Sequence, residues 1–378
     1  MSAPPQGPKV VLVLQGGGGL GAYHIGAYQA LHEADFTPEW VCGTSIGAIN
    51  AAVLVGNKPD DRLDRLEELW AEISRPDGWG DWVPNSLQRA FNTGSAMTGL
   101  LLGQPHFFTP NVPSPYMSIP GSLTATSFYD TTPMRATLER LADFHTINSG
   151  TPRLSLGATN VTTGDLTYFD NTRQKIGSEH VLASGSLPPG FPATVVDGEQ
   201  YWDGGIVSNT PLGAVLDDLP SVHTVVFMID LWSAAGKAPS TLDEVLWRQK
   251  EIQYASRTTR HIKSVAARIN LRHQLHTLTS KLPTAKVSDP GISDAVALAY
   301  EAKLDIVHIV YSPSSDQISS SDAEFSRSSI AKRRAAGYDD LKNALQQAPW
   351  RLDNRPADVG AVVHHLARGR MTQHAPLA

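Results

Sequence analysis

The first apolar run of the chain ends in a run of glycines. Residues 9–26 read KVVLVLQGGGGLGAYHIG, with Gly16–Gly19 and then Gly21 following the apolar segment after a single Gln. The apolar segment at residues 9–14 is typical of a strand buried on both faces, and residues 22–34 fit a helix that packs against it. A strand that runs through a glycine loop into a helix predicts an α/β fold with a parallel sheet. The loop itself suits a phosphate cradle, a dinucleotide turn or an oxyanion hole.

The first two roles fit the glycine loop poorly. A phosphate-binding loop needs Lys followed by Ser or Thr after its last glycine, and Gly21 is followed by Ala and Tyr. A dinucleotide turn expects an acid at the end of the second strand, whereas the second predicted strand, residues 40–44, runs into Ser45. Consecutive glycines can turn several backbone N–H groups toward one point, which suits an oxyanion hole. The residues expected to form it are Gly16, Gly17, Gly18 and Gly19.

A second motif lies between the strand at 40–44 and a predicted helix at 46–55. It reads Gly43-Thr44-Ser45-Ile46-Gly47, a G-x-S-x-G pentapeptide. In a strand-to-helix elbow the serine occupies a tight turn that exposes its hydroxyl, and the flanking glycines let neighbouring elements approach. The start of the helix also places positive potential beside any anion formed there. This context predicts that Ser45 is a nucleophile.

A serine nucleophile needs a base, and the sequence offers two kinds. Histidine oriented by an acid is the usual partner, and His180, His223 and His308 are candidates that no pattern separates. The other candidate is the acid in Tyr201-Trp202-Asp203-Gly204-Gly205, which follows a short apolar piece. The residues alone leave both kinds open.

Taken in order, the three motifs resemble those of the patatin-like phospholipases, which combine a glycine-rich loop, G-x-S-x-G and Asp-Gly-Gly or Asp-Gly-Ala. The resemblance spans about residues 9–215 and implies a three-layer α/β/α sandwich with a mostly parallel central sheet. It also implies that Ser45 is the nucleophile, Asp203 the catalytic base and Gly16–Gly19 the oxyanion loop. The glycines that support the motifs are Gly21, Gly43, Gly47, Gly204 and Gly205.

The implied activity is that of a serine lipid acyl hydrolase, an esterase or phospholipase of the A type that works through an acyl-enzyme without metal or cofactor. One departure bears on the substrate, because many family members place Arg or Lys before the last glycine of the loop, where this chain has Leu20. Two alternatives remain. One is a catalytically weak lipid-binding or scaffold protein on the same fold, and the other is a histidine-dependent α/β-hydrolase.

The pattern along the chain predicts three parts. Residues 9–215 form the catalytic domain, interrupted at about 76–128 by an irregular apolar segment that resembles a lid. Residues 216–353 form an α/β extension, similar to the C-terminal region of some bacterial patatin-like proteins. It contains one long helix, or two in tandem, from Thr241 to about Ser280, beginning with a capping-box pair. Residues 354–378 are expected to form a flexible tail.

Composition and charge limit the class of protein and its expected cellular location. A net charge of −6 argues against a nucleic-acid-binding protein, and the single Cys42 excludes an internal disulfide. No apolar run is long enough to span a membrane and the first residues do not resemble a secretory signal, so we expect a soluble cytoplasmic protein. Seven basic residues against Glu251 alone, from Arg248 to Arg272, form either a solvated face or a surface for peripheral contact with an anionic membrane. The sequence does not define an oligomeric state.

Overall fold

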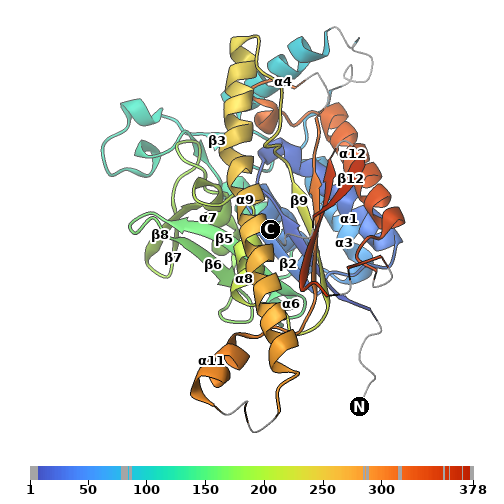
Figure 1. Cartoon of the computed structure of the whole chain (residues 1–378). Helices are drawn as coiled ribbons and strands as arrows, with labels where there is room; N and C mark the ends of the chain where they lie inside the picture. Colours follow the sequence, from blue (N-terminus) through green and yellow to red (C-terminus); the bar gives the residue numbers. More distant parts are fainter. Residues whose placement is uncertain are drawn as a thin grey trace.

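The centre of the protein is a ten-stranded sheet, most of whose strands are parallel (Figure 1). The computed structural model describes residues 7–77, 84, 87–283, 286, 289–313, 317–351, 354–356, 358–367 and 369–374, without the side chains of 123, 256–260 and 374. The strand order is β12-β11-β10-β9-β1-β2-β5-β8-β7, with β6 also paired to β5. The strands from β11 to β5 are parallel, whereas β12, β6, β8 and β7 are antiparallel to their neighbours.

The strands of this sheet come from the whole length of the chain. Their bounds are β1 Lys9–Leu14, β2 Trp40–Thr44, β5 Arg153–Asn160, β6 Leu166–Asp170, β7 Thr194–Val196, β8 Glu199–Asp203, β9 Thr224–Asp230, β10 Leu304–Val310, β11 Ala361–Ala367 and β12 Arg370–His374. A separate two-stranded ribbon pairs β3, Thr109–Pro110, with β4, Tyr129–Asp130.

Helices cover both faces of the sheet, which confirms the predicted three-layer α/β/α sandwich. Figure 1 shows the long helix α9 crossing one face, while α1, α3 and α12 lie on the other side. The bounds are α1 Tyr23–Glu33, α2 Ile46–Val55, α3 Arg62–Glu72, α4 Gln88–Leu102, α5 Thr132–Leu141, α6 Phe144–Ile147, α7 Ser178–Gly185, α8 Leu212–Asp217, α9 Leu242–Thr279, α11 Pro290–Leu298 and α12 Arg327–Gln347.

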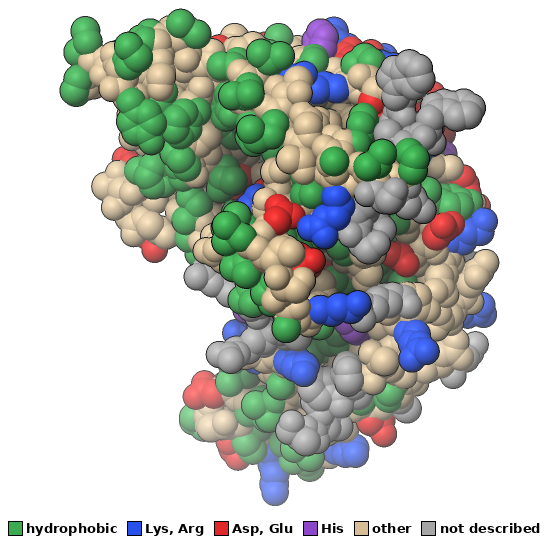
Figure 2. All heavy atoms as spheres, turned by 90° about the horizontal axis from the view of Figure 1, so that it is seen from above, with side chains coloured by type: hydrophobic (Ala, Val, Ile, Leu, Met, Phe, Trp, Pro, Cys, Tyr) green, Lys and Arg blue, Asp and Glu red, His purple; other side chains and the backbone are tan. Residues whose placement is uncertain are grey.

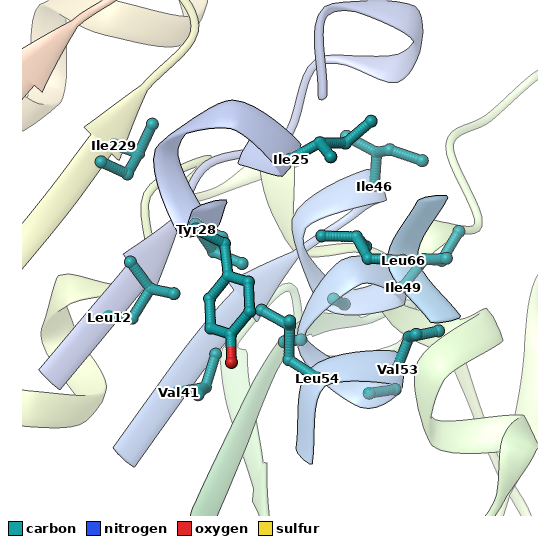
Figure 3. Packing of buried hydrophobic residues seen from close by; sticks show 14 of the residues in the cluster. Leu12, Ile25, Tyr28, Val41, Ile46, Ile49, Val53, Leu54, Leu66 and Ile229 are labelled. Atoms are coloured by element: carbon teal, nitrogen blue, oxygen red, sulfur yellow. The ribbon is translucent and has the colours of Figure 1, made fainter. Parts of the chain in front are cut away.

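Strand β1 shows why both faces must be covered. Its side chains alternate, so that Leu12 and Leu14 join the core beneath α1, α2 and α3, whereas Val11 and Val13 join the core beneath α8 and α9. Figure 3 shows the first of these cores, where Leu12 faces side chains such as Tyr28 of α1. All of these side chains are buried, as the continuous apolar pattern of a parallel strand requires.

The predicted long helix is confirmed as α9. The hydroxyl of Thr241 accepts a hydrogen bond from the Glu244 N–H at 3.2 Å, and the Glu244 carboxylate accepts one from the Ser240 N–H at 2.7 Å. These bonds satisfy backbone donors that would otherwise be unpaired at the start of the helix. Within the residues that the structure describes, neither α9 nor any other helix is long and apolar enough to cross a membrane.

Two predictions about the organisation of the chain are wrong. The segment expected to be irregular contains the fifteen-residue helix α4, because a run rich in Gly, Ser and Thr hides the weak helical pattern of its few apolar residues. The expected tail contains β11 and β12, and β11 is mostly buried against β10. Its signal was missed because the run Ala361–Ala367 is short and includes two histidines. The sheet also continues across the predicted boundary at residue 216, since β9 pairs with β1.

Helices α1 and α12 approach each other closely. A Cβ atom on Gly26 would collide with the backbone of Arg334 and Tyr338, and one on Gly337 would collide with the backbone of Tyr23. The two helices approach each other backbone to backbone, which only glycine allows. This contact fixes the C-terminal helix against the first helix of the chain.

We expect Gly337→Ala to lower the free energy of unfolding by more than about 2 kcal/mol, because two backbones must separate to admit the methyl group. Equilibrium denaturation measures this. The matched control is Gly94→Ala in α4, where a Cβ atom meets no atom within 4 Å, so helix propensity should raise the same free energy by about 0.5–1 kcal/mol. Equal effects of the two substitutions would contradict the close approach.

Candidate active site

Ser45 lies in a strained turn between β2 and α2. Its backbone has φ 57° and ψ −128°, a combination that residues with side chains rarely adopt. The turn is fixed by the Ser45 N–H, which donates to the Ser184 carbonyl at 3.0 Å and approaches the Ser184 hydroxyl at 3.2 Å. The predicted elbow is therefore present, and it lifts the Ser45 hydroxyl away from the strand and the helix.

The glycines around Ser45 are required by close packing. A Cβ atom on Gly43 would meet the backbone of Gly47 and Ala48, and one on Gly47 would meet the Leu14 carbonyl. A Cβ atom on Gly21 would lie 2.8 Å from the Ile46 side chain. The ends of β1 and β2 and the start of α2 thus pack closer than any larger residue permits.

Asp203 lies beside Ser45 at the end of β8. Its carboxylate accepts a hydrogen bond from the Gly205 N–H at 2.7 Å, and Asp203 and Ser45 line the same cavity. The Asp203 backbone is fixed by its N–H, which donates to the Ser186 carbonyl at 2.9 Å. The Gly204 position is crowded as well, since a Cβ atom there would lie 2.5 Å from the Gly157 carbonyl. The structure thus brings the second and third motifs together.

The Asp203 carboxyl is buried, and this changes its acidity. Burial raises the pKa of Asp203 from its ordinary value of 3.8 to about 6, and the hydrogen bonds from Ser45 and Gly205 offset part of the rise. At neutral pH the carboxyl is still mostly ionised, but it accepts a proton far more readily than an exposed aspartate.

The Gly16 peptide is held by side chains that the motifs do not include. Its N–H donates to the Asn209 carbonyl at 3.2 Å, and its carbonyl accepts from Asn209 Nδ2 and from Trp232 Nε1, both at 2.9 Å. The Gly16 amide is therefore already used. The amides of Gly17 and Gly18 have no hydrogen-bond acceptor in the described part of the chain, and both residues line the cavity described below, whereas Gly19 does not.

Gln15 connects this loop to the neighbouring strand. Its Oε1 accepts from the N–H groups of Leu231 and Trp232 at 2.6 and 3.1 Å, and its Nε2 donates to Thr210 Oγ1 at 2.9 Å. Thr210 Oγ1 in turn donates to the Asp230 carboxylate at 2.9 Å. The sequence pattern overlooked Gln15, Asn209 and Trp232, although Asn209 lies in the stretch that follows Asp203.

The C-terminal half packs directly onto the glycine loop. A Cβ atom on Gly18, where φ is +54°, would collide with the Asp322 carbonyl, and one on Gly19 would lie 2.5 Å from the Glu324 carbonyl. Arg333 holds this segment in place by donating to the Glu324 carbonyl at 2.7 Å. The glycine run is therefore required partly by the close approach of another segment.

Ser45 and Asp203 open into a cavity of about 280 Å³ with mainly apolar walls. Seven aromatic residues contribute to it from both halves of the chain, and two of them, Phe108 and Tyr129, have ring centroids 4.7 Å apart. The other apolar and C-terminal residues of the wall include Leu100, Phe107, Phe191, Phe325, Trp232, Tyr254, Asp322 and Ala323. Its mainly apolar lining suits an apolar group beside the hydroxyl.

The histidine candidates lie elsewhere. His223 Nε2 contacts Asp305 Oδ2 at 2.8 Å, His308 Nε2 contacts Asp230 Oδ2 at 2.8 Å, and His180 Nδ1 accepts from the Gly177 N–H at 2.9 Å. No histidine is among the residues that line the cavity in the described structure. Leu20 is fully buried in the core and does not line the cavity either.

The patatin-like class of proteins is defined by a three-layer sandwich that carries a glycine loop, a serine elbow and an adjacent aspartate. Here the loop follows β1 and the elbow follows β2, both in the middle of the sheet. A family model described as patatin-like phospholipase matches residues 12–216, and one described as patatin phospholipase matches residues 252–357. The first match covers more than half of the chain. The chain therefore belongs to the patatin-like phospholipase family.

Individual relatives align with short stretches. Triacylglycerol lipase ptl3 of Schizosaccharomyces pombe is 47% identical over 56 residues, which is 15% of this chain and 12% of the lipase. A patatin-like phospholipase domain-containing protein of Coccidioides immitis is 43% identical over 90 residues, which is 23% of this chain and 12% of that protein. The aligned stretch is thus a small part of each relative.

Two solved structures align with the chain. VipD of Legionella pneumophila aligns with 90% of this chain and 67% of its own at 15% identity, with a TM-score of 0.37. A chain in the structure of the complex of SpcU with ExoU from Pseudomonas aeruginosa aligns over 77% of this chain and 68% of its own length, at 15% identity and with a TM-score of 0.26.

The raised pKa of Asp203 predicts a pH-dependent stability difference. The folded state binds the Asp203 proton more tightly than the unfolded state does, so protonation of Asp203 stabilises the folded state. This contribution to the free energy of unfolding is complete below about pH 4 and is lost as the pH rises through about 6. Asp203→Asn cannot titrate. Its free energy of unfolding relative to wild type should therefore rise by about 2–3 kcal/mol between pH 4 and pH 8.

Denaturant unfolding of both proteins across that pH range measures the difference. Asp165→Asn, which removes an exposed carboxyl on the turn between β5 and β6, controls for the loss of one negative charge. If the free energies of unfolding of Asp203→Asn and wild type differed by the same amount at every pH in this range, the raised pKa assigned to the buried Asp203 carboxyl would be contradicted.

Proposed function

We propose that the protein is a serine lipid acyl hydrolase that uses Ser45 and Asp203 as a catalytic dyad. The observation that carries the proposal is a serine in a strained turn and a buried carboxyl that line the same apolar cavity. Membership of the patatin-like phospholipase family and the name of the lipase relative support a lipid ester as the substrate class. The proposed enzyme class is a carboxylic ester hydrolase.

In the proposed reaction, the Ser45 oxygen attacks the ester carbonyl carbon while the Ser45 proton passes to the Asp203 carboxylate. The tetrahedral intermediate collapses, Asp203 returns the proton to the departing alcohol, and the acyl group stays on Ser45. Water, deprotonated by Asp203, then attacks the acyl carbon; the bond to the Ser45 oxygen breaks, the fatty acid leaves, and Asp203 returns the proton to Ser45. The raised pKa of Asp203 favours each proton transfer, because it brings the carboxyl closer to the acidity of its partners in the transition state.

We propose the Gly17 and Gly18 amides as donors to the oxyanion, in place of the four-glycine set expected from the sequence. Both line the cavity beside Ser45, and no acceptor for either amide occurs within the described residues. Gly16 contributes by holding the loop through Asn209 and Trp232. Removal of one oxyanion donor typically slows the acyl-transfer step by 10²- to 10³-fold.

We propose that both of the domains expected from the sequence contribute residues to one active site. Residues 9–215 supply the dyad and the loop, and we propose that residues 216–353 complete the acyl pocket, since Trp232, Tyr254 and Phe325 line it. The alternative of a histidine-dependent hydrolase has less support because the described cavity contains no histidine. The alternative of a non-catalytic scaffold has less support as well, because it does not explain the strained turn at Ser45 or the burial of the Asp203 carboxyl. A cytoplasmic location stays a prediction.

Labelling with a fluorophosphonate probe tests the dyad. We expect wild type to be labelled and Ser45→Ala to lose both labelling and ester turnover, the latter by at least about 10⁴-fold. The matched control is Ser208→Ala, which removes a nearby hydroxyl bonded to the Thr210 carbonyl and should be labelled like wild type. Labelling that persists in folded Ser45→Ala would exclude Ser45 as the nucleophile.

Two adjacent leucines test the acyl pocket. Leu100 lines the cavity, whereas Leu101 points to solvent with 67% of its surface exposed. An indole at position 100 fills space that a long acyl chain needs. We therefore expect Leu100→Trp to lower kcat/KM for p-nitrophenyl palmitate at least about tenfold relative to p-nitrophenyl butyrate. Leu101→Trp should leave that ratio unchanged, and a ratio that responds equally to both substitutions would contradict the pocket.

A further inference from the structure

The segment that leads to the cavity exposes an unusual amount of apolar surface. Of the 21 large hydrophobic side chains exposed in the described structure, nine belong to residues 87–119. The most exposed form a group that we call the apolar rim, with 67–88% of each side chain accessible. Its members are Leu101, Leu102, Val112, Tyr116, Met117 and Ile119. Figure 2 shows hydrophobic side chains gathered at the upper left, on the side where the segment between β3 and β4 lies.

The same part of the chain carries no charge. Between Arg89 and Asp130 there are forty residues without Asp, Glu, Lys or Arg, although about seven would be expected at the 18% charged content of the whole chain. Surfaces of soluble proteins rarely combine contiguous apolar exposure with a lack of charge unless something else covers them. The rim therefore has the character of a docking surface.

The rim adjoins the wall of the cavity at the end of α4. Leu101 and Leu102 follow Leu100, which lines the cavity, and the Tyr129 hydroxyl, on a ring that also lines it, donates to the Leu100 carbonyl at 2.6 Å. A second protein seated on the rim would cover this entrance. A lipid surface would instead present its ester groups to it.

The predicted basic surface on α9 is less suited to this role. Lys250 binds Asp322 at 2.8 Å, Arg248 binds Glu251 at 2.8 Å, and Arg272 donates to the Leu298 carbonyl at 2.8 Å. Three of the seven basic residues in this cluster are therefore already bonded within the protein. A rim without charge on a protein of net charge −6 gains nothing from an anionic lipid.

We propose that the apolar rim docks the protein on the surface of zwitterionic phospholipid, with its apolar side chains inserted among the lipids and the cavity mouth facing them. The proposal rests on the proposed function, because it assigns to the rim the delivery of substrate to Ser45. Insertion of uncharged side chains predicts binding that depends little on ionic strength, in contrast to binding through basic residues.

Flotation of the full chain with phosphatidylcholine vesicles tests the docking without any need for turnover. Ser45→Ala is used throughout so that the vesicles stay intact. Adding Tyr116→Ser, Met117→Ser and Ile119→Ser to it should lower the partition coefficient at least about tenfold. The matched control adds Leu271→Ser and Leu278→Ser, which remove leucines of similar exposure, 64% and 63%, from the far half of α9. This control should bind like Ser45→Ala alone.

Three further measurements complete the test. Binding should change little between about 0.1 and 1 M salt, over which the Debye length falls from ~10 to ~3 Å. In the chain with Ser45 intact, the rim substitutions should lower hydrolysis of vesicle lipid and leave hydrolysis of soluble p-nitrophenyl butyrate unchanged. Light scattering should show the same oligomeric state with and without the rim substitutions.

Three results would overturn the docking proposal. They are binding that the rim substitutions do not change, binding that requires anionic lipid and is lost in high salt, and a dimer in wild type that the rim substitutions dissociate. The last would assign the rim to a second copy of the chain. Failure of the proposed function gives a different result, because wild type would then hydrolyse no soluble ester whatever its vesicle binding.

Discussion

The close approach of three backbone segments around Ser45 is the constraint on which the rest of the site depends. The end of β1 meets the start of α2 at Gly47, and the turn at Gly43 folds against the same helix. Because side chains are excluded there, the loop after β1 lies next to the serine, and the strain at Ser45 is held by the surrounding core. Asp203 reaches this point from a strand antiparallel to its neighbour, so its carboxyl enters from the opposite direction and becomes buried beside the hydroxyl.

The C-terminal half belongs to the same structure as the motifs. It supplies β9 and β10 to the sheet, packs α12 against α1 through Gly26 and Gly337, and presses the segment around Asp322 onto the glycine loop. Gln15 extends this connection, since its side chain bonds both to the chain after β9 and to Thr210. The position of the loop beside Ser45 therefore depends on contacts with residues roughly two hundred positions or more further along the chain.

The basic cluster and the apolar rim lie on different segments of the chain, the former on α9 and the latter from α4 to β4. Two basic side chains of α9 from the cluster that the sequence presented form ion pairs within the protein, Arg248 with Glu251 and Lys250 with Asp322 beside the cavity. The uncharged stretch from α4 to β4 instead divides between the cavity and the solvent, with Phe107 and Phe108 inside and Tyr116 and Met117 outside. One segment thus lines the proposed acyl pocket and exposes the rim around it.

The sequence by itself determined the central fold and the three motifs, because buried strands, an elbow and capped helices leave local patterns at Lys9–Leu14, Ser45 and Thr241. It did not reveal α4 or the strand pair at the C-terminus, whose local signals are weak and whose stability comes from burial against distant elements. Only the tertiary structure shows that Asp203, and none of the three candidate histidines, lies with Ser45 at the cavity, since this proximity and the burial of Asp203 arise from packing between strands. It likewise showed that the Gly16 amide is occupied, because its acceptor, Asn209, lies far away in the chain.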